Sequence, residues 1–133
     1  IWLYTSGRID GFVANIYAMG NPAVFWGGLV FLVVSAIYSF FEKNKKLGLV
    51  IFSYFVFFAP WAISPRIMFL YHYLPSIPFL AIIIGWTLRK YDELIIPFFA
   101  FALLLFIYFY PHLTGIKVPT ALDTSYYWFN SWR

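Results

Sequence analysis

The chain has 133 residues, of which 63% are hydrophobic, 26% aromatic and 11% charged, and its formal net charge is +4. This composition leaves too little polar surface for a soluble domain, so it excludes that class and indicates an integral membrane protein. The positive charge lies mainly in short loops, and we interpret it as a signal of membrane topology rather than as a nucleic-acid-binding surface.

Residues 1–20 form an aromatic segment in which polar and apolar residues alternate only weakly. We expect an extracytoplasmic helix or loop at the membrane interface, where tryptophan and tyrosine side chains are favoured. The segment starts at Ile1 without a methionine or the charged region of a signal peptide, so we expect the chain to be part of a longer polypeptide.

Apolar stretches follow at residues 23–41, 47–63, 67–88 and 94–110, within a predicted transmembrane domain over residues 21–110. At about 1.5 Å of rise per residue, helices of these lengths reach roughly 25–33 Å, which is close to the hydrocarbon thickness of a bilayer. They lack the amphipathic period of soluble helices and the short alternating segments of an outer-membrane barrel. We therefore predict an all-α membrane protein with four transmembrane helices.

Helix-start signals support these spans. Asn21-Pro22 and Ser64-Pro65 each combine a capping side chain with a proline suited to the first helical position. Asp92-Glu93 offers carboxylates to the positive end of the fourth helix dipole. Gly27, Gly28 and Gly48 are expected to permit close contacts between helices.

Basic residues predict the orientation of the spans. Five of the nine lysine and arginine residues lie in two short loops, at residues 42–46 and 89–93. Loops rich in these residues remain in the cytoplasm. Residues 1–20, the Ser64-Pro65 turn and an aromatic-rich tail at residues 111–133 are then extracytoplasmic.

A candidate site lies in the run SPRIMFLYHYLPSIPF, from Ser64 to Phe79, where polar and ionisable groups interrupt an apolar stretch. Such groups are costly in a membrane and usually mark a functional site. Ser64 precedes the predicted helix start, and Arg66 follows in its first turn. Free amides, the helix dipole and a guanidinium would together bind a lipid phosphate. The alternative is that Arg66 only reaches out to lipid headgroups.

Neighbouring side chains extend this candidate site. Tyr73 lies on the same helical stripe as Arg66, so both could contact one phosphate. His72 either bonds a neighbouring helix or contacts donor or substrate. Pro75 and Pro78 each remove a helix hydrogen bond, and the expected kink either shapes a groove for an isoprenoid chain or serves packing alone.

Metal or thiolate chemistry is not indicated. The chain has no cysteine, and its two histidines, His72 and His112, are too few and too far apart for a metal-site motif. We predict no metal and no cofactor.

Three motifs point to a family: GNPAVFW at residues 20–26, RIMFLYHYLPSIPF at residues 66–79, and the spaced tail TGIKVP…YYW…SW between residues 114 and 132. The middle motif is the most specific, because an arginine followed by an aromatic residue and then by Tyr-His-Tyr-Leu-Pro is rare in generic apolar spans. In order and spacing they resemble the carboxy-terminal four-helix region of the protein O-mannosyltransferases. The resemblance covers the chain from about Ile9 onward.

The resemblance implies the carboxy-terminal part of a multi-spanning, GT-C-type glycosyltransferase. Its donor would be mannose on a polyprenyl (dolichyl-type) phosphate, acting as substrate, and its acceptor a serine or threonine of a protein on the extracytoplasmic side. In that family this region supports the lipid donor. We therefore predict donor binding by Ser64, Arg66, His72 and Tyr73.

The family's catalytic acidic residues lie upstream of this region, in the first external loop. Asp10 and Asp123 do not form the family's paired acidic pattern, and the carboxylates of Glu42, Asp92 and Glu93 lie in the predicted cytoplasmic loops. We assign no catalytic residue to this chain.

Other classes stay open. Another lipid-linked-sugar transferase would face the same donor-binding problem, and a noncatalytic scaffold would need no anion site. A transporter fragment would be expected to carry charges near the membrane midplane, whereas the strong charge of these spans lies at a rim. From the compact loops we expect a prokaryotic plasma membrane rather than the endoplasmic reticulum.

Overall fold

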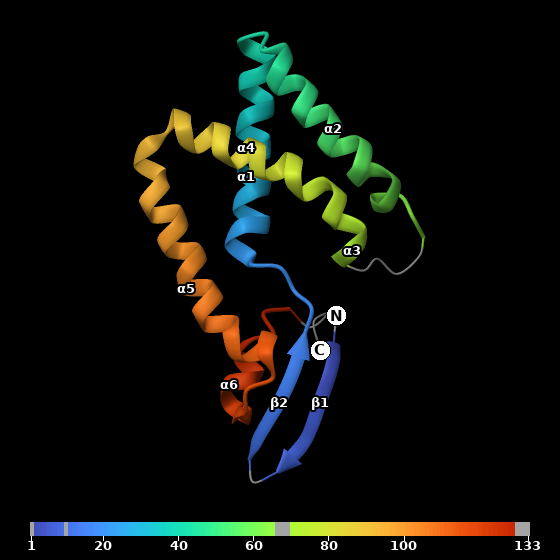
Figure 1. Ribbon diagram of the computed structural model, residues 1–133, viewed down its shortest axis with the longest axis vertical. Coiled ribbons are helices and arrows are strands. Elements are labelled where there is room, and N and C mark those ends of the chain that lie inside the picture. Colours follow the sequence, from blue (N-terminus) through green and yellow to red (C-terminus); the bar gives the residue numbers. More distant parts are fainter. Residues whose placement is uncertain (1, 10, 66–69, 130–133) are drawn as a thin grey trace. The chain divides into compact units, whose positions relative to one another are not determined.

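The computed structural model describes residues 2–9, 11–65 and 70–129, which are mostly helical (Figure 1). The chain divides into two compact units. We call them the helical unit, Asn21–Ala102, and the terminal unit, which joins Ile1–Gly20 to Leu103–Arg133. The boundary near residue 102 falls inside a helix, so α5 (Ile95–Thr114) begins in the helical unit and ends in the terminal unit.

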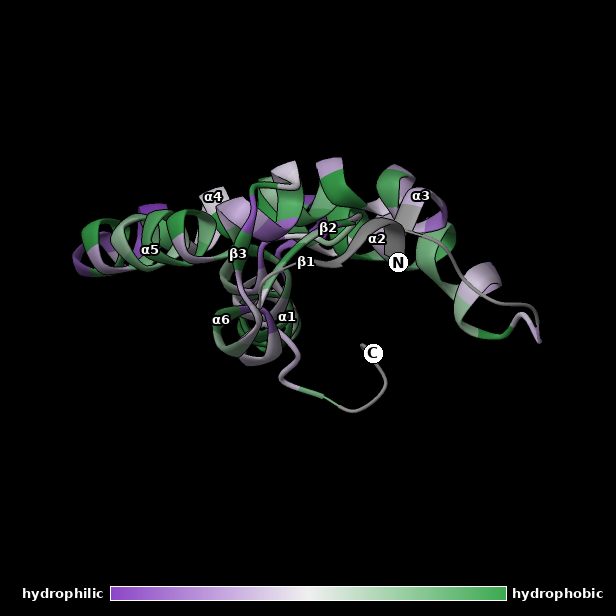
Figure 2. Ribbon diagram, turned by 90° about the horizontal axis from the view of Figure 1, so that it is seen from below, coloured by the Kyte–Doolittle hydropathy of each residue, from purple (hydrophilic) through white to green (hydrophobic). Residues whose placement is uncertain are grey.

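The helical unit contains the predicted spans. Its elements are α1 (Pro22–Phe41), α2 (Lys45–Ala62), α3 (Leu70–Tyr73), the 3-10 turn η1 (Leu74–Ser76), α4 (Ile77–Lys90), the 3-10 turn η2 (Asp92–Leu94) and the first part of α5. In the described part of the chain, four helices are long and apolar enough to cross a membrane. Much of their length is green in Figure 2, which marks hydrophobic residues. The predicted membrane fold is confirmed.

Helix bounds differ most from the predicted ones in the fourth and third spans. The fourth span continues past residue 110 to Thr114 and contains Pro111, although a proline removes one helix hydrogen bond. The third span, expected from residue 67, has its first described helical residue at Leu70, and residues 66–69 lie outside the described part. The predicted helix start at Ser64-Pro65 therefore stays a prediction.

The start of α1 is confirmed in detail. Asn21 Oδ1 accepts a hydrogen bond of 2.9 Å from the amide of Ala23, and Pro22 occupies the first helical position. The Asn21 Nδ2 group also donates to the carbonyl of Ala102 at 2.8 Å. One side chain thus caps α1 and holds it to α5 within the helical unit.

The core of the helical unit lies where α4 packs against α1 and α2. Its buried members are Leu32, Tyr54, Leu80, Ile83, Ile84 and Leu88. Gly28 allows α4 to approach α1, because a Cβ built on it would lie 2.9 Å from Leu80 Cδ2. Near this contact Ser35 and Thr87 share a buried hydrogen bond of 2.9 Å. The predicted role of Gly28 in close helix packing is confirmed.

A break in the third span occurs where the prolines predicted a kink. The helical hydrogen bonding of α3 changes to the 3-10 turn η1, which contains Pro75, and α4 then begins with Pro78 near its start. A proline inside a helix removes a backbone donor, so the tighter turn accommodates that loss.

The terminal unit corrects the prediction for residues 1–20. These residues form not an interfacial helix or loop but a hairpin of β1 (Trp2–Ile9) and β2 (Phe12–Tyr17), and β3 (Val118–Pro119) pairs antiparallel with β2. Gly11 turns the hairpin with a φ of 78°, which favours glycine. The prediction failed because β2 pairs with β3, a segment distant in sequence, and local sequence patterns do not reveal such pairing.

The tail folds onto this sheet. After α5 ends, Gly115 takes a φ of 73°, and its amide bonds the carbonyl of Pro111 at 3.0 Å. The short helix α6 (Thr120–Ser125) follows β3. Phe109, Val118 and Tyr126 form the apolar core of the terminal unit.

Candidate functional site

The predicted donor-binding segment lies between the end of α2 and the start of α4. The backbone amide of Ser64 donates to the carbonyl of Trp61 at 3.2 Å, which places Ser64 at the end of the α2 turn. Arg66 lies outside the described residues, so its predicted phosphate contact stays a prediction. His72 and Tyr73 are on α3, the short helix that precedes the proline break.

Tyr73 is paired with a tyrosine of the neighbouring helix. Its hydroxyl lies 2.9 Å from that of Tyr54 on α2, and Tyr54 is fully buried. In such a pair one hydroxyl donates to the other, which leaves one hydroxyl proton available to a third group. The arrangement can therefore present a neutral hydrogen-bond donor within an apolar surrounding.

An aromatic cavity of about 270 Å³ adjoins this tyrosine pair. It is lined from α1, α2 and α3 by Phe25, Trp26, Leu29, Tyr54, Phe58 and Tyr73. The ring of Phe58 stacks on Tyr54 with centroids 5.6 Å apart, and that of Phe25 tilts against Tyr73 at 5.3 Å. Small-molecule sites usually enclose about 300–1,000 Å³. The cavity is therefore suited to part of a long apolar molecule.

His72 does not line this cavity and contacts a different residue of α2. Its ring lies 4.2 Å from that of Trp61 on α2 and 4.1 Å from that of Tyr71, centroid to centroid. The contact with Trp61 agrees with the interpretation that His72 interacts with a neighbouring helix. A contact between His72 and the donor stays a prediction.

A second cluster of polar side chains lies in the terminal unit, where Asn15, His112 and Asp123 are all buried. Asn15 Nδ2 donates to Asp123 Oδ1 at 2.8 Å. His112 Nδ1 is 3.6 Å from the same carboxylate oxygen, which is too long for a hydrogen bond but close enough for electrostatic attraction if the imidazole is protonated. The cluster joins β2, the end of α5 and α6.

Tyrosines enclose this cluster. The ring of Tyr17 stacks on His112 at a centroid distance of 4.2 Å, and the hydroxyl of Tyr127 donates to that of Tyr17 at 3.0 Å. Burial raises the pKa of the Tyr127 phenol, and the hydrogen bond to Tyr17 and the nearby charge of Asp123 raise it further. Tyr127 therefore keeps its proton at neutral pH and can donate this bond.

Sequence reasoning missed both the tyrosine pair and the buried cluster. His112 and Asp123 were considered only as metal or catalytic candidates, Asn15 was not singled out, and Tyr54 was noted only as one of the aromatic residues that crowd the second span, which either pack against lipid or line a polyprenyl groove. A polar residue at the end of an apolar span, such as His112, is the signal that could have raised the question. Among the described residues no group of three or more potential metal ligands is present.

The two predicted cytoplasmic loops are held together by one ion pair. Lys90 Nζ lies 3.1 Å from Glu42 Oε1 and 3.2 Å from the centroid of the Tyr38 ring. The turn that follows α1 and the end of α4 are therefore at the same end of the helical unit. This arrangement is what the predicted topology requires, while the side of the membrane stays a prediction.

One known protein is similar to this chain over most of its length. It is a polyprenol-phosphate-mannose–protein mannosyltransferase of Corynebacterium glutamicum, 25% identical over 134 residues. The match covers 89% of this chain and 26% of the bacterial protein, so the chain spans about a quarter of that relative's length. No protein-family description matches the chain, and no solved structure matches it.

The similarity and the fold agree at a general level. The chain is an integral membrane protein whose described part has four apolar helices, and it resembles part of a transferase named for a lipid-linked sugar. The motifs at residues 20–26, 66–79 and 114–132 point to the same family.

Proposed function

We propose that this chain is the carboxy-terminal membrane domain of a glycosyltransferase that takes mannose from a polyprenyl phosphate and transfers it to serine or threonine hydroxyls of proteins. The chain's own task is to hold the lipid donor on the extracytoplasmic side of a prokaryotic plasma membrane. The remainder of the polypeptide supplies the acidic residues that activate the acceptor. No residue of this chain is assigned a proton-transfer role.

The observation that carries this proposal is the Tyr54–Tyr73 pair at the wall of an aromatic cavity. The two hydroxyls are 2.9 Å apart, and the other lining side chains are apolar. A polyprenyl phosphate has the matching character, because a long apolar chain ends in a strongly accepting phosphate. The similarity to a transferase that uses such a donor supports the same assignment.

Each part of the proposed site has a distinct task. The aromatic walls take the first isoprene units and keep water from them. The hydroxyl proton left over by the tyrosine pair bonds a phosphate oxygen. Arg66, seven positions before Tyr73, contributes the positive charge that a phosphate needs in a surrounding of low polarity. Correct placement of the donor then reduces the entropic part of the transfer barrier.

Donor binding by tyrosine variants tests this proposal. In the full-length enzyme, Tyr73→Phe removes the hydroxyl and keeps the ring that lines the cavity. The lost hydrogen bond is worth about 0.5–1.5 kcal/mol, so the Kd for polyprenyl-phosphate mannose should rise roughly two- to tenfold. A titration of lipid donor into nanodisc-embedded enzyme measures this change.

The matched control is Tyr71→Phe, because Tyr71 is the same residue type on the same short helix but is exposed and does not line the cavity. Its Kd should be unchanged. Equal donor affinity in the Tyr73→Phe and wild-type enzymes, with both correctly folded, would remove the tyrosine pair from the donor site.

A further inference from the structure

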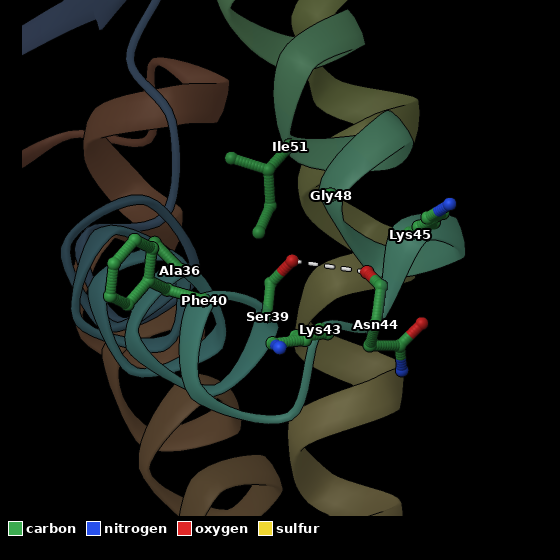
Figure 3. A pocket seen from close by; sticks show the side chains of 8 residues that line it. All are labelled: Ala36, Ser39, Phe40, Lys43, Asn44, Lys45, Gly48 and Ile51. Carbon is green, nitrogen blue, oxygen red and sulfur yellow. Dashed lines mark hydrogen bonds between the residues drawn. The ribbon is translucent and has the colours of Figure 1, made fainter.

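The helical unit has a second cavity at the turn between α1 and α2. It is an open cavity of about 530 Å³, within the roughly 300–1,000 Å³ range of small-molecule sites. Ala36, Phe40 and Ile51 line its apolar part, and Lys43 and Lys45 line its basic part. Figure 3 shows these side chains around the turn, with Lys43 reaching back beneath Ser39.

The turn is rigidly built. The amide of Asn44 donates to the carbonyl of Ser39 at 3.1 Å, and Ser39 Oγ donates to the carbonyl of Asn44 at 3.1 Å, drawn as a dashed line in Figure 3. Asn44 Oδ1 accepts from the amide of Leu47 at 3.2 Å and so caps α2. The backbone of the turn that carries the cavity is therefore held in place by hydrogen bonds.

Lys43 occupies a backbone conformation that lysine seldom adopts. Its φ is 51°, in the left-handed region where glycine is favoured and a Cβ is strained. A glycine would make the same turn with less strain. The presence of a lysine at this position is explained if its ammonium group has a use at the cavity.

The charged residues that line the cavity are both basic. They are Lys43 and Lys45, whereas the adjacent carboxylate, Glu42, is paired with Lys90 at 3.1 Å. Lys45 points outward in Figure 3, and its flexible four-carbon stem allows its ammonium group to move to the rim. The site therefore combines apolar walls with a cationic mouth.

The depth of this cavity in the membrane indicates which kind of ligand it can bind. The turn joins two membrane-crossing helices, so it lies at the level of the lipid headgroups. Basic pockets between transmembrane helices at the cytoplasmic surface bind anionic headgroups. We propose that this cavity binds one anionic glycerophospholipid, with its phosphodiester at Lys43 and Lys45 and an acyl chain along Ala36, Phe40 and Ile51.

Native mass spectrometry of the full chain in detergent tests the proposal, with phosphatidylglycerol and phosphatidylcholine as probes. One phosphatidylglycerol should be retained in preference to phosphatidylcholine. Lys43→Gln should weaken its retention by about tenfold or more, because a charge-assisted contact is lost. Ala36→Phe, which fills the cavity without changing charge, should weaken it as well.

Lys46→Gln is the matched control, because it removes the same charge from the same segment at a residue that does not line the cavity. It should leave retention unchanged. The proposal is overturned if Lys46→Gln weakens retention as much as Lys43→Gln, if phosphatidylcholine is retained equally well, or if millimolar inorganic phosphate displaces the lipid. Circular dichroism verifies that each variant keeps its helical content.

Discussion

The two units bury polar groups in different ways. In the helical unit such groups are scattered hydroxyls within an apolar core: Ser35 bonds Thr87, Tyr54 bonds Tyr73, and the Ser76 hydroxyl is buried without a hydrogen-bond partner among the described residues. In the terminal unit Asn15, His112 and Asp123 form one connected cluster. Transmembrane helices satisfy their backbone groups internally, so a few side-chain bonds suffice between them. The terminal unit joins distant segments of chain, and the polar cluster adds to the strand pairing of β2 with β3 and to the apolar core of Phe109, Val118 and Tyr126.

The largest loss of stability is expected from a substitution at Asp123, in the buried polar cluster of the terminal unit. Asp123→Ala leaves the amide of Asn15 without its 2.8 Å acceptor and removes the carboxylate that faces His112. Loss of a buried partner costs about 1–3 kcal/mol, and more for a charged group. Hydrogen exchange should increase in residues 12–17 and 115–125 and stay unchanged in α1 and α4.

Asp92→Ala is the control for this change, since Asp92 is exposed and lies outside the cluster. Its exchange pattern should match the wild type away from η2. If Asp123→Ala instead raised exchange throughout α1 and α4, the two units would not be stabilised separately, and the comparison between them would fail.

An intermediate effect is expected where α1 and α4 meet. Gly28→Val places a side chain where even a Cβ would lie 2.9 Å from Leu80, and overpacking of this kind costs about 1–3 kcal/mol. Gly85→Val is the matched control, because nothing lies within 4 Å of a Cβ built there. Thermal unfolding in detergent should show a lower midpoint for Gly28→Val than for Gly85→Val, and equal midpoints would exclude close packing at Gly28.

The smallest effect is expected from an isolated hydroxyl pair. Ser35→Ala removes one partner of Thr87, which still donates to the carbonyl of Ile83 at 2.9 Å. Interhelical bonds of this kind contribute about 0.6 kcal/mol on average. Ser53→Ala, at a serine whose hydroxyl donates to the carbonyl of Leu49 within α2, is the control for the serine-to-alanine change. A loss at Ser35 as large as that of Asp123→Ala would contradict the contrast between the units.

The sequence was sufficient to predict the spans, because apolar length and helix capping are local properties. The start at Asn21-Pro22 and the break near Pro75 follow from residues adjacent in the chain. The hairpin at residues 2–17 was missed because its alternation is weak and its pairing with Val118 depends on a segment more than a hundred residues away.

The candidate site was predictable only in part for the same reason. The motif around Tyr73 can be recognised in the sequence because it is polar within an apolar span. Tyr54, the hydrogen-bond partner of Tyr73, is one of many aromatic residues on α2. Nothing local distinguishes Tyr54 from Phe55 or Phe58 beyond a hydroxyl. Similarly, Asn15 and Asp123 are 108 positions apart, so only the fold brings them together.

The central claim is that the aromatic cavity beside the Tyr54–Tyr73 pair holds the donor lipid. Photocrosslinking with a polyprenyl phosphate that carries a diazirine on its first isoprene units tests it most directly. The account predicts that peptides containing Phe25, Trp26, Phe58 or Tyr73 are labelled, and that unmodified polyprenyl phosphate competes. Labelling confined to the exposed apolar face of α5, at Ile96 and Phe99, would contradict it.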